Sequence, residues 1–159
     1  MTHQTSDNIR DIAPADLPRI HEIAVAGWRP IFTRYRRIVG DEMWQDLWGG
    51  WEKGWVAHTP ETWNGRGIVT ERDGQVTGFA TWWFPDGGIA EVGGNAVDPA
   101  FQGCGIGSSQ IRWVLDMFRR EGHRYARVHT GLDPAHGPAR AEYRNAGLRL
   151  GVTNSEYYN

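Results

Sequence analysis

One stretch of the chain decides the fold: Asn95-Ala96-Val97-Asp98-Pro99-Ala100-Phe101-Gln102-Gly103-Cys104-Gly105-Ile106-Gly107-Ser108-Ser109. It has the pattern of a β-strand that enters a glycine-rich turn, and the turn opens directly into a helix. The alternating glycines let the backbone come close to a ligand and aim consecutive N–H groups in one direction. The unpaired N–H groups and the positive dipole end of the helix favour an anion. We therefore expect a phosphate-bearing cofactor at this turn.

The spacing of these glycines excludes two common phosphate loops. A Walker loop requires Gly-x-x-x-x-Gly-Lys-Ser/Thr, and no lysine follows Gly107. A dinucleotide fingerprint requires Gly-x-Gly-x-x-Gly, and Ser108 stands where its third glycine belongs. The pattern present is Gln-x-x-Gly-x-Gly over residues 102–107, preceded by Val97-x-Pro99. This pattern resembles the acetyl-coenzyme-A loop of the GNAT superfamily of acyltransferases, Gln/Arg-x-x-Gly-x-Gly/Ala.

A second segment, residues 136–148, resembles the late motif of the same superfamily, Asn-x-x-Ala-x-x-x-Tyr-x-x-x-Gly-Phe. Ala139, Tyr143 and Gly147 keep its register. His136 stands in place of the usual Asn, and Leu148 in place of the usual Phe. The two motifs lie within residues 89–148, so the first half of the chain carries no motif of comparable strength.

The resemblance implies one domain over residues 1–159 of the α/β (α+β) class. Its central twisted sheet would be mixed but mostly antiparallel, with about six to seven strands, helices on both faces and a splayed parallel pair. Alternation and turn residues predict strands at 9–12, 67–72, 75–84 and 89–97, the last three as an antiparallel meander. A strand at 125–130 would pair parallel to 89–97. Residues 148–152 and the tail would add one or two edge strands.

Helical periodicity predicts a first helix from residue 16 that breaks at Trp28-Arg29-Pro30, followed by a second helical region at 31–39. A further helix at 41–55 is predicted, although the Gly49-Gly50 pair disfavours continuity there. Its tryptophans are spaced to share one face that would pack on the sheet, namely Trp44, Trp48, Trp51 and Trp55. After the glycine turn, a core-facing stripe predicts a helix that ends at Gly122: Ile111, Val114, Leu115 and Phe118.

Composition narrows the class of protein and its partners. The formal charge of −2 argues against nucleic-acid binding, which normally shows a basic excess. A single cysteine, Cys104, precludes an internal disulfide and suits a reducing cytosol. No run reaches about 18 apolar residues, so we expect a cytoplasmic protein without a membrane partner. For the oligomeric state, a monomer and a homodimer both stay open. The six histidines show no metal-site spacing, so no metal is expected.

Acetyl transfer to an amine requires a base, because an alkylamine of pKa about 10.4 is only about one part in a thousand neutral near pH 7. Glu91 is the candidate general base. It lies six residues before Val97 in the strand that enters the turn, which would place it on the same face as Gly93 and Asn95. Histone-type members of the superfamily carry a catalytic glutamate at this spacing. The alternatives are that Glu91 binds the ammonium group of the substrate or is structural.

Tyr143 is the candidate general acid. A phenol of pKa about 10 stays protonated at neutral pH and can protonate a departing thiolate. Its register in the late motif matches the tyrosine that plays this role across much of the superfamily. The alternative is an amphipathic core tyrosine.

The resemblance implies acetyl-CoA as the cofactor. Its pantetheine arm would lie along the strand end, where the Asn95 N–H faces the thioester oxygen, and its pyrophosphate would bind the N–H groups of the turn. His136 would hydrogen-bond that arm, act on the thiol side or cap a helix. Cys104 occupies a position that is often basic in relatives, so Arg140 or Arg144 would supply the missing phosphate contact. The cofactor residues expected are Asn95, Ala96, Val97, Gln102, Gly103, Cys104, Gly105, Ile106, Gly107, Ser108 and His136.

Aromatic residues of the first helices suggest an acceptor pocket beside Glu91. Trp28, Phe32, Tyr35 and Trp82 or Trp83 would wall it, and such a wall suits a cationic or aromatic amine. The leading hypothesis is an N-acetyltransferase that acts on the primary amine of a small molecule by direct attack. Transfer to a protein N-terminus or lysine, transfer to a hydroxyl, and a non-catalytic acyl-CoA-binding or regulatory module are the alternatives.

Overall fold

The structure is a computed structural model that describes residues 7–53, 66–85 and 88–151. Its elements follow the chain as β1 (Asn8–Asp11), α1 (Leu17–Val39), α2 (Asp41–Trp48), β2 (Gly67–Arg72), β3 (Gln75–Trp83), β4 (Ile89–Val97), α4 (Ile106–Arg120), β5 (Tyr125–Val128) and α5 (Gly137–Asn145). Short 3-10 turns lie at Pro14–Asp16, Pro99–Phe101 and Pro134–His136. Within the described ranges, no helix is both long and apolar enough to cross a membrane.

The strands form one mixed sheet in the order β1-β2-β3-β4-β5. The first four strands are antiparallel neighbours, which confirms the predicted meander, and β5 pairs parallel to β4. The described residues thus form five strands, fewer than the six to seven predicted. Residues 148–151 form no strand, and 152–159 lie outside the described residues. Gly147 adopts φ 96° and the Leu148 N–H donates to the Tyr143 carbonyl at 3.0 Å, so the chain closes a helix cap there.

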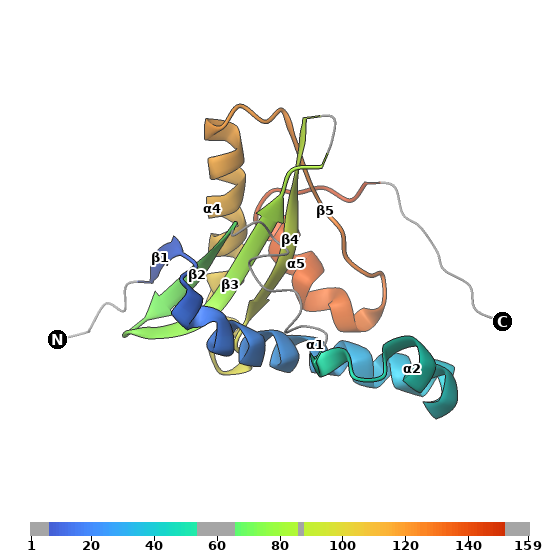
Figure 1. Cartoon of the computed structure of the whole chain (residues 1–159). Helices are drawn as coiled ribbons and strands as arrows, with labels where there is room; N and C mark the ends of the chain where they lie inside the picture. The colour runs from blue at the N-terminus through green and yellow to red at the C-terminus, as the bar shows by residue number, and fades with distance from the viewer. Residues whose placement is uncertain (1–6, 54–65, 86–87, 152–159) are drawn as a thin grey trace.

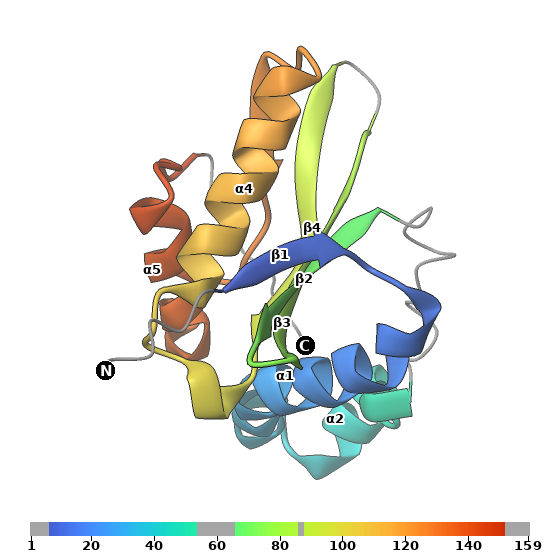
Figure 2. The ribbon, with the colours of Figure 1, turned by 90° about the vertical axis from the view of Figure 1, so that its left-hand side faces the viewer.

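Helices cover both faces of the sheet (Figures 1 and 2). One face packs against α1 through an apolar cluster that joins Ile20, Ile23 and Ala24 to Phe79 and Ala96 of the strands. The other face packs against α4 and α5. The predicted stripe of α4 lies in that second core, namely Ile111, Val114, Leu115 and Phe118, and Tyr143 of α5 joins it.

The first helix is continuous through Pro30, so the predicted break at residues 28–30 is wrong. A proline removes one helical hydrogen bond and crowds the preceding turn. Here Pro30 is exposed, so water can solvate the carbonyl that loses its partner. Packing holds the helix on both sides of the proline: Ile23 lies in the core before it, and Arg34 forms an ion pair with Asp133 at 2.6 Å after it.

The tryptophans of the α2 region pack on α1 rather than on the sheet. The Phe32 ring stacks on Trp51 with centroids 4.2 Å apart, and Tyr35 lies 5.3 Å from Trp48. The Trp44 indole N–H donates to the Phe32 carbonyl at 3.2 Å. Helix α2 ends at Trp48, where Gly49-Gly50 forms a turn, as the glycine pair suggested. The fourth tryptophan, Trp55, lies outside the described residues.

Candidate active site

The parallel pair β4–β5 opens partway along its length. Its ladder runs from Ile89 beside Tyr125 to Val92 beside Val128, and β5 ends there, two residues earlier than predicted. Figure 1 shows the chain beyond β5 running away from β4 towards α5. Residues 93–97 of β4 keep only their ladder to β3. Because strand backbone groups that lack a ladder partner must bond elsewhere, this edge can accept an extended ligand.

A β-bulge interrupts β4 at the level of this opening. Ala80 of β3 pairs with Asn95, and Trp82 pairs with Val92, so Gly93 and Gly94 together face Thr81. The Thr81 hydroxyl donates to the Gly94 carbonyl at 2.9 Å, and a Cβ at Gly93 would lie 2.7 Å from that hydroxyl. A glycine is therefore required at position 93, and the extra residue shifts the alternation of the strand by one.

The bulge separates Glu91 from Asn95. Cross-strand partners share a face. Val92 and Asn95 pair with Trp82 and Ala80, which belong to the core under α4, whereas Glu91 pairs with Trp83 on the opposite face. The prediction that Glu91 and Asn95 share a face is therefore wrong, because strict alternation fails where one strand carries an extra residue.

Glu91 is only 5% exposed, and both of its carboxylate oxygens are engaged. Oε2 accepts from Arg127 Nε at 2.5 Å, and Oε1 lies 2.8 Å from His129 Nδ1. Burial pushes the pKa of Glu91 upwards, but the hydrogen bonds from His129 and Arg127 outweigh it and hold the pKa below its ordinary value. Glu91 is thus an ionised carboxylate. Neither partner is predicted from the sequence, although the parallel register aligns Arg127 with Glu91.

Tyr143 lies on the α5 side of the sheet, 8% exposed. Its hydroxyl donates to Asn95 Oδ1 at 2.8 Å, so the side chain of Asn95 links β4 to α5. Burial and the neighbouring Glu142 raise the pKa of Tyr143 well above its ordinary value, and the bond to Asn95 opposes them only in part. The phenol therefore stays protonated at neutral pH.

The glycine turn has the backbone geometry that an anion cradle needs. Gly103 and Gly105 adopt φ of 79° and 82°, which L side chains rarely tolerate. Gln102 Nε2 donates to the Val97 carbonyl at 3.1 Å and fixes the turn against the end of β4. Within α4, the Ser109 N–H donates to the Gly105 carbonyl at 3.0 Å. The N–H groups of residues 106–108 thus belong to the first helical turn and have no helical acceptor.

The same segment is anchored on both sides. Ile106 is buried in the core, and Ser108 is also buried. The Asp98 N–H donates to the Thr77 carbonyl at 2.8 Å, and its carboxylate forms an ion pair with Arg19 of α1. The end of β4 is therefore held in place before the turn begins.

Glu142 is a site residue that the sequence analysis did not single out. A Cβ at Gly107 would lie 2.3 Å from Glu142 Oε1, so a side chain at position 107 would displace the Glu142 carboxyl group. Asn95 Nδ2 lies 3.5 Å from Glu142 Oε2. Burial raises the pKa of Glu142. A half-buried carboxyl group therefore stands beside the helix start that would receive an anion.

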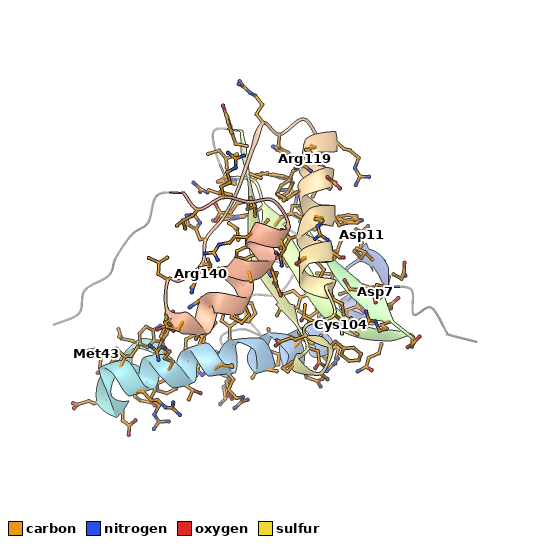
Figure 3. The ribbon with its side chains drawn as sticks, turned by 180° about the vertical axis from the view of Figure 1, so that it is seen from behind. Asp7, Asp11, Met43, Cys104, Arg119 and Arg140 are labelled. Carbon is orange, nitrogen blue, oxygen red and sulfur yellow. The ribbon has the colours of Figure 1, made fainter. Side chains whose placement is uncertain are left out.

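An arginine other than those predicted lies near the turn. Arg72 of β2 forms a two-pronged ion pair with Asp7, at 2.7 and 2.9 Å. Asp7, and then the exposed thiol of Cys104, raise the pKa of Arg72. Figure 3 shows Asp7 and Cys104 on the same side of the molecule. Arg140 instead donates to the carbonyl groups of Gly131 and Asp133, at 2.7 and 2.8 Å. Its side chain therefore serves the loop before α5.

Comparison with known proteins settles the family. A profile of the acetyltransferase (GNAT) family matches residues 19–148. The chain belongs to this family. It is 33% identical over 90 residues to a mycothiol acetyltransferase of Clavibacter sepedonicus, which is 57% of this chain but only 29% of that relative.

Solved GNAT structures share the fold. An acetyltransferase from Brucella melitensis in complex with acetyl-CoA superposes with a TM-score of 0.64 at 23% identity, over 92% of this chain and 85% of that one. The PaiA N-acetyltransferase of Thermoplasma acidophilum in complex with coenzyme A superposes with a TM-score of 0.70 at 16% identity, over 94% of this chain and 93% of that one. The aminoglycoside N-acetyltransferase AAC(6')-Iy in complex with CoA superposes with a TM-score of 0.66 at 16% identity, over 100% of this chain and 98% of that one.

His136, which replaces the usual GNAT asparagine, occupies the N-cap position of α5 without capping it through its side chain. Its Nδ1 is buried and has no hydrogen-bond partner in the described structure. Burial lowers the pKa of His136, so the ring is neutral. A Cβ at Gly131 would lie 2.6 Å from the ring, and the Tyr35 ring centroid lies 6.1 Å away. The capping role is thus not formed.

The predicted aromatic wall of this GNAT chain is not assembled as one surface. Phe32 and Tyr35 belong to the cluster with Trp48 and Trp51, and Trp28 packs at the edge of the α1 core. Trp82 is 8% exposed and lies beside Trp113 of α4, on the face opposite Glu91, so its assignment to the wall is wrong. Trp83 is 51% exposed and pairs with Glu91. Among the residues described, no group of three or more His, Cys, Asp and Glu side chains could hold a metal ion.

Proposed function

We propose that this GNAT protein is an acetyl-CoA-dependent N-acetyltransferase that acetylates the primary amine of a small molecule by direct attack. One observation carries the proposal. An ionised carboxylate, Glu91, and a protonated phenol, Tyr143, lie on opposite faces of β4 at the point where β4 and β5 separate. A protein that only binds acyl-CoA needs neither group. An acetyltransferase needs a proton acceptor on the amine side and a proton donor on the thiol side.

The residues at the opening fit acetyl-CoA. When bound, this cofactor supplies an acyl group activated as a thioester. The free edge of Asn95, Ala96 and Val97 would pair with the extended pantetheine arm. The backbone N–H groups from Gln102 to Ser108 would hold the pyrophosphate, as helix starts do for other phosphates. The raised pKa of Glu142 reduces its repulsion of that anion.

The surroundings of Glu91 keep it ionised and those of Tyr143 keep it protonated, so the two residues can take opposite roles in proton transfer. On the α1 face, where Trp83 is exposed beside it, the Glu91 carboxylate provides the general-base function, either directly or through a group that it orients. Tyr143 acts as the general acid from the α5 face. Its hydroxyl hydrogen points at Asn95 in the free protein and would turn towards the sulfur when the thiolate departs. The backbone N–H of Asn95 would stabilise the negative charge on the thioester oxygen.

A small-molecule acceptor is supported by the relatives. The curated relative is a mycothiol acetyltransferase, and one structural relative is an aminoglycoside N-acetyltransferase. Since the chain spans 29% of that curated relative, its acceptor is not carried over to this protein. The exposed aromatic surface of Trp83 beside the Glu91 carboxylate suits an amine with a cationic or apolar body.

The test is a panel of amines incubated with acetyl-CoA and read as free thiol. The panel includes amino sugars, amino thiols, polyamines, arylalkylamines and peptides with free N-termini or lysines. We expect thiol release with one class of small amine. Release only with peptides would favour the protein-acetylating alternative. Thermal stabilisation by acetyl-CoA without release across the panel would instead indicate a binding module.

A further inference from the structure

The position of His129 gives it a role that no sequence motif predicted. The last pair of the β4–β5 ladder is Val92 beside Val128, so Gly93 and His129 are the next residues on either side of the opening. His129 lies two residues beyond Arg127 and continues the face of Arg127 and Glu91. The imidazole therefore stands at the mouth of the opening on the α1 face, where the acceptor would arrive.

One nitrogen of the His129 ring, Nδ1, contacts Glu91, and the side chain is otherwise largely exposed to solvent. Nδ1 lies 2.8 Å from Glu91 Oε1, while the side chain as a whole is 73% exposed. A carboxylate that accepts from Nδ1–H fixes the ring orientation and leaves Nε2 as the nitrogen with a lone pair. Arg127, at 2.5 Å from Oε2, holds the other oxygen of the same carboxylate. Arg127 and His129 are the charged or titratable groups in ion-pair contact with Glu91 in the described part of the chain.

Glu91 itself is poorly disposed to meet an amine directly. It is almost fully buried, and both of its oxygens already have cationic or N–H partners. A substrate proton delivered to either oxygen would have to displace Arg127 or His129. The exposed nitrogen of His129 needs no such displacement.

We propose that Glu91 and His129 form a catalytic dyad in which His129 Nε2 accepts the proton of the acceptor amine and Glu91 orients the ring. This inference rests on the proposed acetyltransferase function and deepens it. His129 is then the catalytic residue, and Glu91 is a positioning residue that also stabilises the imidazolium, as a carboxylate does in other carboxylate–histidine pairs.

The protons balance in this scheme. The ammonium form of the acceptor gives one proton to Nε2, and the freed lone pair forms the carbon–nitrogen bond as the carbon–sulfur bond breaks. The sulfur takes the hydroxyl proton of Tyr143, and the nitrogen of the new amide passes its second proton through water to the Tyr143 oxygen. The imidazolium then returns its proton to solvent, so that one proton is released for each turnover.

The first arm of the test needs no activity. Nitrogen-15 spectra of the free protein at alkaline pH should show His129 protonated at Nδ1 and unprotonated at Nε2, assigned by the loss of its signals in His129→Asn. In Glu91→Gln this tautomer preference should be lost or mixed. A His129 ring protonated at Nε2 in the wild-type protein would overturn the dyad.

The second arm uses the amine found in the panel. His129→Asn keeps an N–H donor towards Glu91 but has no base, so kcat/KM should fall about 10²-fold or more while thermal stability stays unchanged. Glu91→Gln should lose a similar factor, and the double variant should lose little more, because groups that act as a unit are not additive. Tyr125→Phe, an exposed change on the same strand, is the matched control and should keep wild-type activity.

Two outcomes separate the dyad from the proposed function. Full activity and an unchanged pH profile in His129→Asn, with loss in Glu91→Gln, would mean that Glu91 is the direct base and would overturn the dyad alone. Failure of the wild-type protein to release thiol with any amine would overturn the acetyltransferase function, and the catalytic role of His129 with it.

Discussion

Tyr143 and Asn95 join the last helix to the strand that enters the glycine turn, through a hydrogen bond of 2.8 Å from the phenol to Oδ1. The bond uses the side chain of Asn95 and leaves its backbone to face the opening between β4 and β5. It also fixes the phenol beside the strand end where the thioester would lie. This hydrogen bond therefore fixes the proposed proton donor relative to the strand that would hold the donor substrate.

Tyr143→Phe removes this donor while keeping the ring. We expect kcat to fall about 10²-fold, since general-acid catalysis contributes about that much or more. Stability should fall by about 1 kcal/mol, because Asn95 Oδ1 loses its partner. Steady-state kinetics and urea unfolding measure the two effects. Unchanged turnover would contradict the general-acid role, whereas the loss of stability would remain.

Glu142→Gln tests the buried carboxyl group next to Gly107. Removing a like charge near the anion cradle should tighten coenzyme A binding by about fivefold, equivalent to about 1 kcal/mol. Isothermal titration calorimetry at two salt concentrations measures this. An affinity equal to that of the wild-type protein would mean that Glu142 is already protonated or lies away from the phosphates.

The same variant has a signed effect on stability against pH. Burial raises the folded-state pKa of Glu142 above its unfolded value, so the folded chain binds more protons between the two values. Stability conferred on the wild-type protein by this group therefore falls as pH rises through that window. Glu142→Gln should be more stable than the wild-type protein above the window, and the difference should vanish below the unfolded pKa. Urea unfolding across pH checks the sign.

Arg72→Ala tests the arginine beside Cys104. If Arg72 contacts a phosphate of the donor, coenzyme A binding should weaken by about fivefold, and by less at high salt. Arg119→Ala is the matched control, because its exposed ion pair with Asp116 lies in the last turn of α4 (Figure 3). Equal binding by both variants would remove Arg72 from the cofactor site.

Trp82 and Trp83 are adjacent in β3, but we expect replacement of Trp82 to affect stability and replacement of Trp83 to affect binding of the acceptor. Trp83→Ala should raise KM for the amine with little change in stability, because its ring is half exposed on the Glu91 face. Trp82→Ala should lower stability by about 3–5 kcal/mol, since it empties a core site under α4. Kinetics paired with thermal unfolding distinguish them. A Trp83→Ala variant with wild-type KM would place the acceptor elsewhere.

The sequence predicted those parts of the fold whose signals are local. The bounds of β2 and β4 match the prediction, because turn residues at Asp73-Gly74 and the glycine turn mark their ends. Helix α4 follows from its apolar stripe. The continuity of α1 through Pro30 could not be predicted from the sequence. The sequence shows the local cost of a proline in a helix, but it does not show the tertiary packing on both sides of Pro30 that offsets this cost.

The motifs of the candidate site could be predicted from the sequence, but the side-chain contacts between its strands could not. Glu91, Tyr143 and the glycine turn are visible as residue types at known spacings. The contacts of Glu91 with Arg127 and His129 depend on the register of two strands that are distant in the chain. The opposite orientation of Glu91 and Asn95 depends on the pairing of β4 with β3, which no single-strand pattern contains.

The extra residue at Gly93-Gly94 has a consequence for how this chain can vary. In a regular strand, positions 91 and 95 would point into the same compartment, and the chemistry on the amine and on the thiol would crowd one side of the sheet. Because of the extra residue, β4 presents Glu91 on one face and Asn95, with Tyr143 bound to it, on the other face. Deleting one of these two glycines would keep every proposed site residue in the sequence and would still turn Glu91 and Asn95 to the same face of the strand.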